Sequence, residues 1–123
     1  MLLMKCKLNK ISIIALLIIV FSLSSCKLDD LSSDSATIKE WISDGALIVD
    51  VRTPGEFEAG HYKNSINIPL NDMEKNLEIL GDKSRPIIVH CRSGWRSIEA
   101  KKVLEKHGYE KVLNAGGLSN MPD

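Results

Sequence analysis

The chain has 123 residues, which is enough for one globular domain and too few for two. Its 16 basic and 16 acidic side chains balance to a formal net charge of zero, and no run of five basic residues occurs. The charge pattern therefore lacks the basic footprint of a nucleic-acid-binding protein, and we expect no nucleic-acid partner.

The first 25 residues have the pattern of an export signal. Lys5, Lys7 and Lys10 precede an apolar run at 11–23 that only two serines interrupt. Thirteen helical residues span about 20 Å, whereas a bilayer core measures about 30 Å, so a cleaved signal is favoured over a permanent transmembrane helix. We predict that residues 1–25 are removed on export.

The end of the apolar run is similar to a bacterial lipobox, in which the last cysteine carries lipid. The residues concerned are Leu23-Ser24-Ser25-Cys26, and the alternative is an ordinary signal peptide with a chance cysteine. We predict lipidation of Cys26 and attachment to a membrane on its extracytoplasmic side, in the periplasm or at the cell surface. Residues 26–35 are polar and form a predicted tether, and residues 36–123 form the domain.

Export changes the charge and the cysteine content of what remains. Loss of the three leader lysines leaves 13 basic against 16 acidic residues, a formal charge of −3. Cys6 lies in the leader and Cys26 at the lipid site, so Cys91 is the only free thiol of the domain and no internal disulfide is possible. A lone exported thiol risks oxidation, which an enzyme that uses the thiol would tolerate.

The remaining chain predicts strands that alternate with helices. Short apolar, β-branched runs predict strands at 46–51, 65–68, 86–90 and from 112–113 into Gly116-Gly117. Helical spacing predicts helices at 35–43, with Ser35 as its cap, at 71–80 and at 97–107. Pro54-Gly55 predicts a turn before one helical turn at 56–59. This order is typical of an α/β domain with a mostly parallel central sheet and helices on both faces.

The residues best suited to catalysis lie in the segment 91–96, here called the thiol loop. It connects the most apolar predicted strand to the last predicted helix. Ligands of open α/β sheets bind at the carboxyl ends of strands, and backbone N–H groups converge at a helix start. Both features stabilise a thiolate and lower the pKa of Cys91. Arg92 and Arg96 would attract an anion, and Gly94 allows the backbone amides to turn inward.

The same segment resembles the active-site loop of rhodanese domains, in which six residues from the cysteine onward cradle a persulfide sulfur. The matching residues are Cys91-Arg92-Ser93-Gly94-Trp95-Arg96-Ser97. Three further blocks match the family in order, namely 47–61, 65–70 and 114–118, so the resemblance covers nearly all of 36–120. The short end after the double glycine resembles the small periplasmic rhodaneses of the phage-shock type. Residues 63–65 depart from the family's usual Pro-Gly-Ala.

The resemblance implies a sulfurtransferase with Cys91 as the nucleophile and a persulfide-binding loop formed by Arg92, Ser93, Gly94, Trp95 and Arg96. It implies a small anionic sulfur donor and a cyanide or thiol acceptor. We expect a monomer without metal or other cofactor. Two other functions stay open: a phosphatase or arsenate reductase of the related cysteine-loop type, and a binding module without turnover.

Several residues near the loop have two interpretations each. Asp50 and Arg52 either orient the loop or bind substrate, or else form structural ion pairs with Glu56 or Glu58, which we favour. His61 is expected to bond backbone, with a supporting role near the site still open. His90 precedes Cys91 in a strand and so faces away from it. Trp95 either shapes the pocket mouth or packs at the base of the helix.

Overall fold

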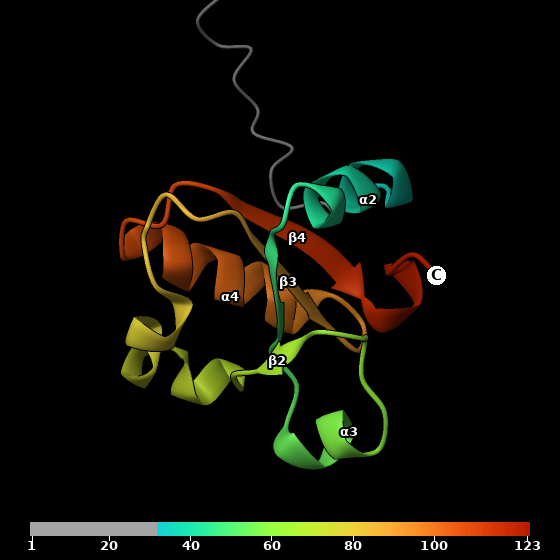
Figure 1. The fold of residues 1–123 in the computed structure, drawn as a ribbon. Helices are drawn as coiled ribbons and strands as arrows, with labels where there is room; N and C mark the ends of the chain where they lie inside the picture. Colours follow the sequence, from blue (N-terminus) through green and yellow to red (C-terminus); the bar gives the residue numbers. More distant parts are fainter. Residues whose placement is uncertain (1–31) are drawn as a thin grey trace, which may run out of the picture.

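The computed structural model describes residues 32–123 (Figure 1). The predicted leader, the Cys26 lipid site and the tether up to residue 31 lie outside these residues. Within residues 32–123, no helix has both the length and the apolar content needed to cross a bilayer.

Within residues 32–123, four parallel strands form one sheet in the order β2-β1-β3-β4. They are β1 (Leu47–Asp50), β2 (Ile66–Asn67), β3 (Ile87–Cys91) and β4 (Val112–Gly117). Every residue of β3 is buried, as expected for a central strand that is covered on both faces. The predicted α/β fold is confirmed, and its sheet is wholly parallel.

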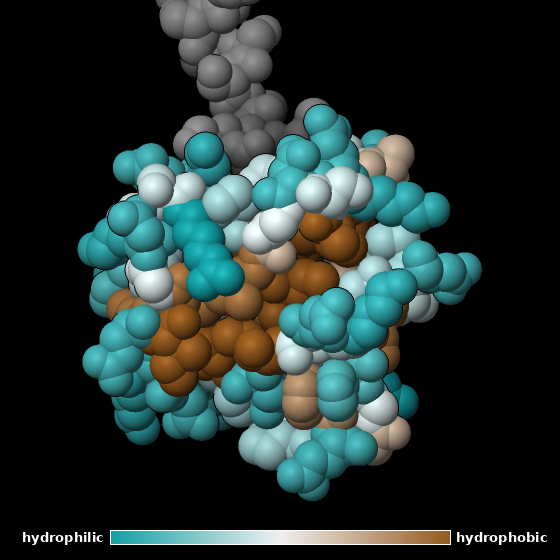
Figure 2. Space-filling model, in the orientation of Figure 1, coloured by the Kyte–Doolittle hydropathy of each residue, from teal (hydrophilic) through white to brown (hydrophobic). Residues whose placement is uncertain are grey.

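Helices cover the two faces of the sheet (Figure 1). On one face, α4 (Trp95–Lys106) and the 3₁₀ helices η1 (Leu70–Lys75) and η2 (Leu77–Leu80) pack on β1 and β3. On the other, α2 (Ser35–Ser43) and η3 (Leu118–Asn120) close a smaller core. Figure 2 shows a band of hydrophobic side chains across the visible face, between hydrophilic rims.

The segment predicted as one helix at 71–80 is two 3₁₀ helices instead. Asn76 separates them with φ −122° and ψ 20°, outside the helical region. Its side-chain amide donates to the carbonyl of Asp72 at 2.8 Å, so a side chain competes for a backbone acceptor of the helix. The apolar spacing still serves its purpose, because Met73 and Leu80 are fully buried.

Two helix starts also differ from the sequence prediction. Asp34, not Ser35, caps α2, because its carboxylate accepts the Thr37 N–H at 2.7 Å. The predicted turn at Pro54-Gly55 is instead the first turn of α3 (Pro54–Glu58). A capping box stabilises this start: the Thr53 hydroxyl accepts from the Glu56 N–H, and the Glu56 carboxylate accepts from the Thr53 N–H.

The start of α4 bears directly on the site. The helix begins at Trp95, two residues before the predicted start, because Gly94 adopts φ +107° and turns the chain directly from the thiol loop into the helix. Cys91 is the last residue of β3 and not the first beyond it. The stretch between strand and helix is therefore only three residues long, at 92–94.

Candidate active site

The thiol lies at the carboxyl end of the central strand and is fully buried. The backbone N–H of Gly94 donates to Cys91 Sγ at 3.0 Å. The Ser97 hydroxyl lies 3.8 Å from the same sulfur and donates to the carbonyl of Gly94 at 2.7 Å. The thiol loop therefore closes around the sulfur of Cys91.

This arrangement changes the acidity of the thiol. Burial raises the pKa of Cys91, but the backbone N–H groups of Ser97, Gly94 and Ser93 and the Ser97 hydroxyl lower it and outweigh burial. The pKa of Cys91 consequently lies below the ordinary value of a thiol. A lowered pKa supplies the thiolate that acts as a sulfur nucleophile.

The double glycine at the end of β4, Gly116-Gly117, packs directly against the thiol loop. A Cβ on Gly117 would lie 2.7 Å from the carbonyl oxygen of Arg92, so only glycine fits against this part of the loop. Gly116 has φ +77° and lies against Gly94. These two glycines therefore serve the backbone geometry of the site.

Arg96 lies in the first turn of α4 and not in a loop. Its guanidinium binds the Glu56 carboxylate with two hydrogen bonds, of 2.7 and 2.9 Å. Glu56 raises the pKa of Arg96, and Arg96 holds the pKa of Glu56 well below its usual range. Part of the charge that was expected to attract an anion is therefore neutralised by α3. Arg92 is exposed and keeps its charge free of any ion pair among residues 32–123.

The expected ion pairs of Asp50 and Arg52 with Glu56 or Glu58 are wrong. Asp50 and Arg52 pair with each other, through contacts of 2.6 and 2.9 Å, and both are buried. Residues two apart at a strand end face the same side, which explains why they meet. Arg52 also donates to the carbonyl of Gly60 at 2.8 Å and so ties the segment after α3 to the end of β1.

Neither neighbouring histidine is positioned as a base for Cys91. His61 bonds the carbonyl of Phe57 through Nδ1 at 2.9 Å and stacks on the Phe57 ring, which confirms a backbone-bonding role. His90 is fully buried, and neither of its ring nitrogens has a hydrogen-bond partner among residues 32–123. Burial lowers the pKa of His90. Its Nε2 lies 4.0 Å from Asp50 Oδ2, so the side chain points to Asp50.

Trp95 lies in the thiol loop at the surface of the domain, with 61% of its surface exposed. It borders two cavities. One, of about 340 Å³, is lined by loop residues together with Ile98 and Asn114, and the other, of about 170 Å³, by Arg96 and the chain after β1 and β2. The exposure of Trp95 argues against packing at the helix base, and the side chain lines both cavities.

Two residues that contribute to the site were not among the predicted site residues. Ser97 touches the thiol, and Glu56 fixes Arg96 from 40 positions away. The spacing Thr53-x-x-Glu56 is a recognisable capping-box pattern and would have located Glu56 at a helix start. No local pattern indicates that the same carboxylate reaches α4.

Comparison with known proteins shows the same domain elsewhere. The sequence pattern of the rhodanese-like domain family matches residues 34–121. The thiosulfate sulfurtransferase PspE of Escherichia coli K12 is 36% identical over 74 residues, which are 59% of this chain and 71% of that protein. A sulfurtransferase of Allochromatium vinosum is 33% identical over 86 residues, which are 68% of this chain and 79% of that protein. A solved structure of a rhodanese with anions from Escherichia coli superposes with a TM-score of 0.60 at 36% identity, covering 63% of this chain and 95% of its own.

Proposed function

The chain belongs to the rhodanese-like domain family and is a sulfurtransferase of that type, and we propose that it carries sulfur as a persulfide on Cys91. The proposed donor is thiosulfate or a persulfide, and the proposed acceptor is cyanide or a thiol. The loop residues Arg92, Ser93, Gly94, Trp95 and Arg96 would surround the carried sulfur.

The reaction divides into two displacements that need no oxidant, metal or organic cofactor. The Cys91 thiolate attacks the outer sulfur of thiosulfate, the S–S bond of thiosulfate breaks, and sulfite leaves with the bonding electrons. The carbon of cyanide then attacks the outer sulfur of the persulfide. Thiocyanate leaves, and the Cys91 thiolate is regenerated.

One observation carries this proposal: the contact between Cys91 Sγ and the Gly94 N–H at the start of α4, at 3.0 Å. A thiolate there, and the terminal sulfur that follows it, face backbone donors that are already in place. Because Cys91 is fully buried, the thiol loop has to shift to admit the donor. The two cavities that Trp95 lines lie beside that loop.

The test is thiocyanate release from thiosulfate and cyanide. We expect steady release by the wild-type chain and none by Cys91→Ser, whose side chain is of similar size and should leave the fold intact. Release by Cys91→Ser at the wild-type rate would eliminate the persulfide route. Absence of release by both proteins would favour the third function, a binding module.

The structure gives a reason to prefer sulfur over phosphate chemistry. Cysteine-loop phosphatases have the pattern Cys-x5-Arg, whereas Cys91 and Arg96 form Cys-x4-Arg. Arg96 is also occupied by both oxygens of Glu56 and does not present its fork to the loop. We expect negligible hydrolysis of aryl phosphates, and a glycine inserted after Gly94 should weaken sulfur transfer. Efficient phosphatase activity that Cys91→Ser abolishes would reverse this choice.

The location of the enzyme is a second part of the proposal. The lipobox-like residues 23–26 support lipid attachment at Cys26 and a membrane-bound, extracytoplasmic domain. Stable attachment requires more than one acyl chain, as a processed lipoprotein carries. Expressed with its own leader, the protein should enter the membrane fraction and incorporate labelled fatty acid, and Cys26→Ala should do neither. A wild-type protein that is wholly unlabelled would exclude the anchor.

A further inference from the structure

The first described residues enter the domain beside the thiol loop. The Ser33 N–H donates to the carbonyl of Asn114 in β4 at 2.8 Å. Ser32 lies against Gly116, two residues further along β4, so the chain traced backwards runs toward the carboxyl end of the sheet. Ser32 also lines the same cavity as Trp95. The tether therefore meets the domain at the end that carries the candidate site.

The tether is short compared with the domain. Five residues lie between Cys26 and Ser32, so the two are six residue steps apart, which is at most about 21 Å of extended chain. A flexible chain of that length has a root-mean-square span of about 13 Å. A compact domain of this size is about 32 Å across, from a radius of gyration of about 12 Å. A lipid on Cys26 thus keeps the thiol-loop end nearer the membrane than the opposite end.

The surface at that end has the residue types that phospholipids attract. Trp95 is one of two large apolar side chains that are more than half exposed among residues 32–123, the other being Ile79. An indole combines an apolar body with a polar N–H and is favoured at the lipid–water interface. Arg92 is exposed in the same loop, and its free charge would be drawn to anionic headgroups.

We propose that the end of the domain bearing Trp95 and Arg92 rests on the phospholipid surface in which Cys26 is anchored. Sulfur exchange at Cys91 then takes place at the membrane surface, with donors and acceptors that reach that surface. This inference rests on the proposed lipidation of Cys26 and adds an orientation to it. It does not depend on which sulfur compound is transferred.

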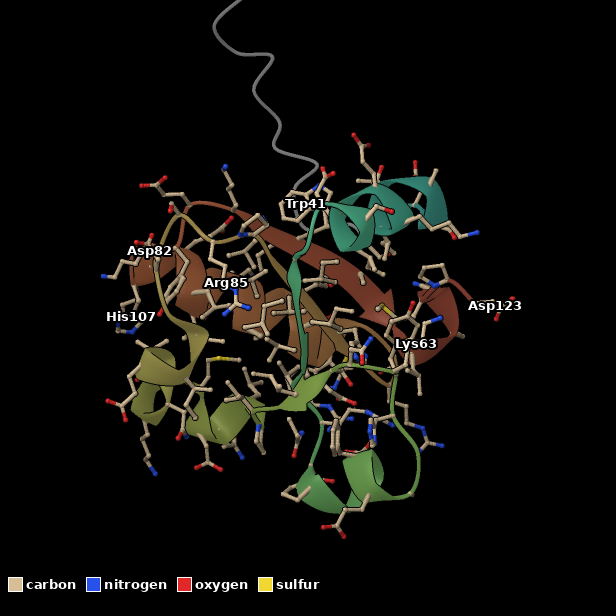
Figure 3. All side chains as sticks on the ribbon, in the orientation of Figure 1. Trp41, Lys63, Asp82, Arg85, His107 and Asp123 are labelled. Atoms are coloured by element: carbon tan, nitrogen blue, oxygen red, sulfur yellow. The ribbon has the colours of Figure 1, made fainter. Side chains whose placement is uncertain are left out.

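The chain's two tryptophans are natural probes of this orientation. Trp41 borders a small cavity with Pro86 and Lys111, which precede β3 and β4, so it marks the amino end of the sheet. Figure 3 shows Trp41 at the top of the view, on α2. Trp41→Phe leaves only Trp95 to fluoresce, and Trp95→Phe leaves only Trp41.

The experiment uses the full, lipidated chain in vesicles of phosphatidylethanolamine and phosphatidylglycerol that carry a nitroxide quencher on the headgroup. We expect Trp95 in the Trp41→Phe variant to lose most of its emission, and Trp41 in the Trp95→Phe variant to keep most of its own. Inserting roughly 20 flexible residues after Asp30 raises the span of the tether to about 28 Å and should restore much of the Trp95 emission.

Equal quenching of the two tryptophans, or stronger quenching of Trp41, would overturn the orientation. Quenching of Trp95 that the longer tether leaves unchanged would overturn the tether argument. Recovery of the wild-type chain outside the membrane would remove both the anchor and this inference. Thiocyanate release by Trp41→Phe in the same vesicles reports separately on the proposed sulfur transfer.

Discussion

Replacing Ser97 with alanine removes one buried oxygen atom beside the thiol and should raise the pKa of Cys91. In the thiol form, the S–H of Cys91 points to Ser97 Oγ at 3.8 Å, and the hydroxyl donates to the carbonyl of Gly94. Once the proton has left, the hydroxyl can turn and donate to the thiolate. The hydrogen bond from the Ser97 hydroxyl to the charged sulfur is stronger than its bond to the neutral Gly94 carbonyl, and the difference stabilises the thiolate by about 1 kcal/mol. Loss of this hydroxyl in Ser97→Ala should therefore raise the pKa of Cys91 by up to about one unit.

The kinetic consequence has opposite signs at low and high pH. Below both pKa values, a rise of one unit reduces the thiolate population about tenfold, but the more basic thiolate is about threefold more nucleophilic. The net rate of persulfide formation should therefore fall about threefold in Ser97→Ala. Above both pKa values the thiol is fully ionised in either protein, and the variant should react about threefold faster. The two rate profiles should cross.

Residues 27–123 contain Cys91 as their only cysteine, so the ultraviolet absorbance of the thiolate against pH gives its pKa directly. Ser93→Ala is the matched control, because Ser93 acts on the thiol through its backbone N–H, which alanine retains. An unchanged pKa in Ser97→Ala, or an equal rise in Ser93→Ala, would refute the role given to the Ser97 hydroxyl.

Three further predictions concern stability. Gly117→Ala should lower the free energy of unfolding by about 1–3 kcal/mol because its Cβ would lie 2.7 Å from a backbone oxygen of the thiol loop, whereas Gly55→Ala meets nothing within 4 Å and should change it by less than about 1 kcal/mol. Urea denaturation measures both, and equal effects would contradict the packing argument. Burial lowers the pKa of His90 in the folded chain. Below the ordinary value of 6.5, His90 therefore binds a proton in the unfolded chain but stays neutral in the folded chain. Stability should therefore fall with falling pH below that value, by at most about 1.4 kcal/mol per pH unit from this group, and His90→Gln should show a smaller slope. An identical slope in the variant would exclude His90 as the source. Asp34→Ala should lower the Tm and Ser35→Ala should leave it unchanged, since Asp34 caps α2; the reverse result would restore the sequence-based assignment.

The strands and the position of the thiol were predictable because they depend on local composition. A short apolar run rich in β-branched residues, such as 86–90, is typical of a buried strand. In the structure every residue of β3 is buried. The order strand, short glycine-containing loop, amphipathic helix then places Cys91 where strand ends and helix start meet. The 3₁₀ geometry at 70–80 was not predictable from periodicity, since one side-chain bond of Asn76 interrupts an otherwise helical pattern.

The charge pairing around the site was predicted incorrectly for a different reason. By sequence spacing, Glu56 and Glu58 were equally plausible ion-pair partners of Arg52. In the structure, Arg52 instead forms an ion pair with Asp50, and Glu56 forms one with Arg96. These choices depend on where α3 lies relative to α4, which is a tertiary arrangement. Local spacing does not contain that information.

In the proposed mechanism, Cys91 itself carries the transferred sulfur. Mass spectrometry of residues 27–123 after incubation with thiosulfate tests it directly. We predict the added mass of one sulfur atom on the peptide that contains Cys91, its removal by cyanide, and no such addition in Cys91→Ser. Thiocyanate release without any sulfur on Cys91, or sulfur retained by the Cys91→Ser variant, would contradict the persulfide mechanism.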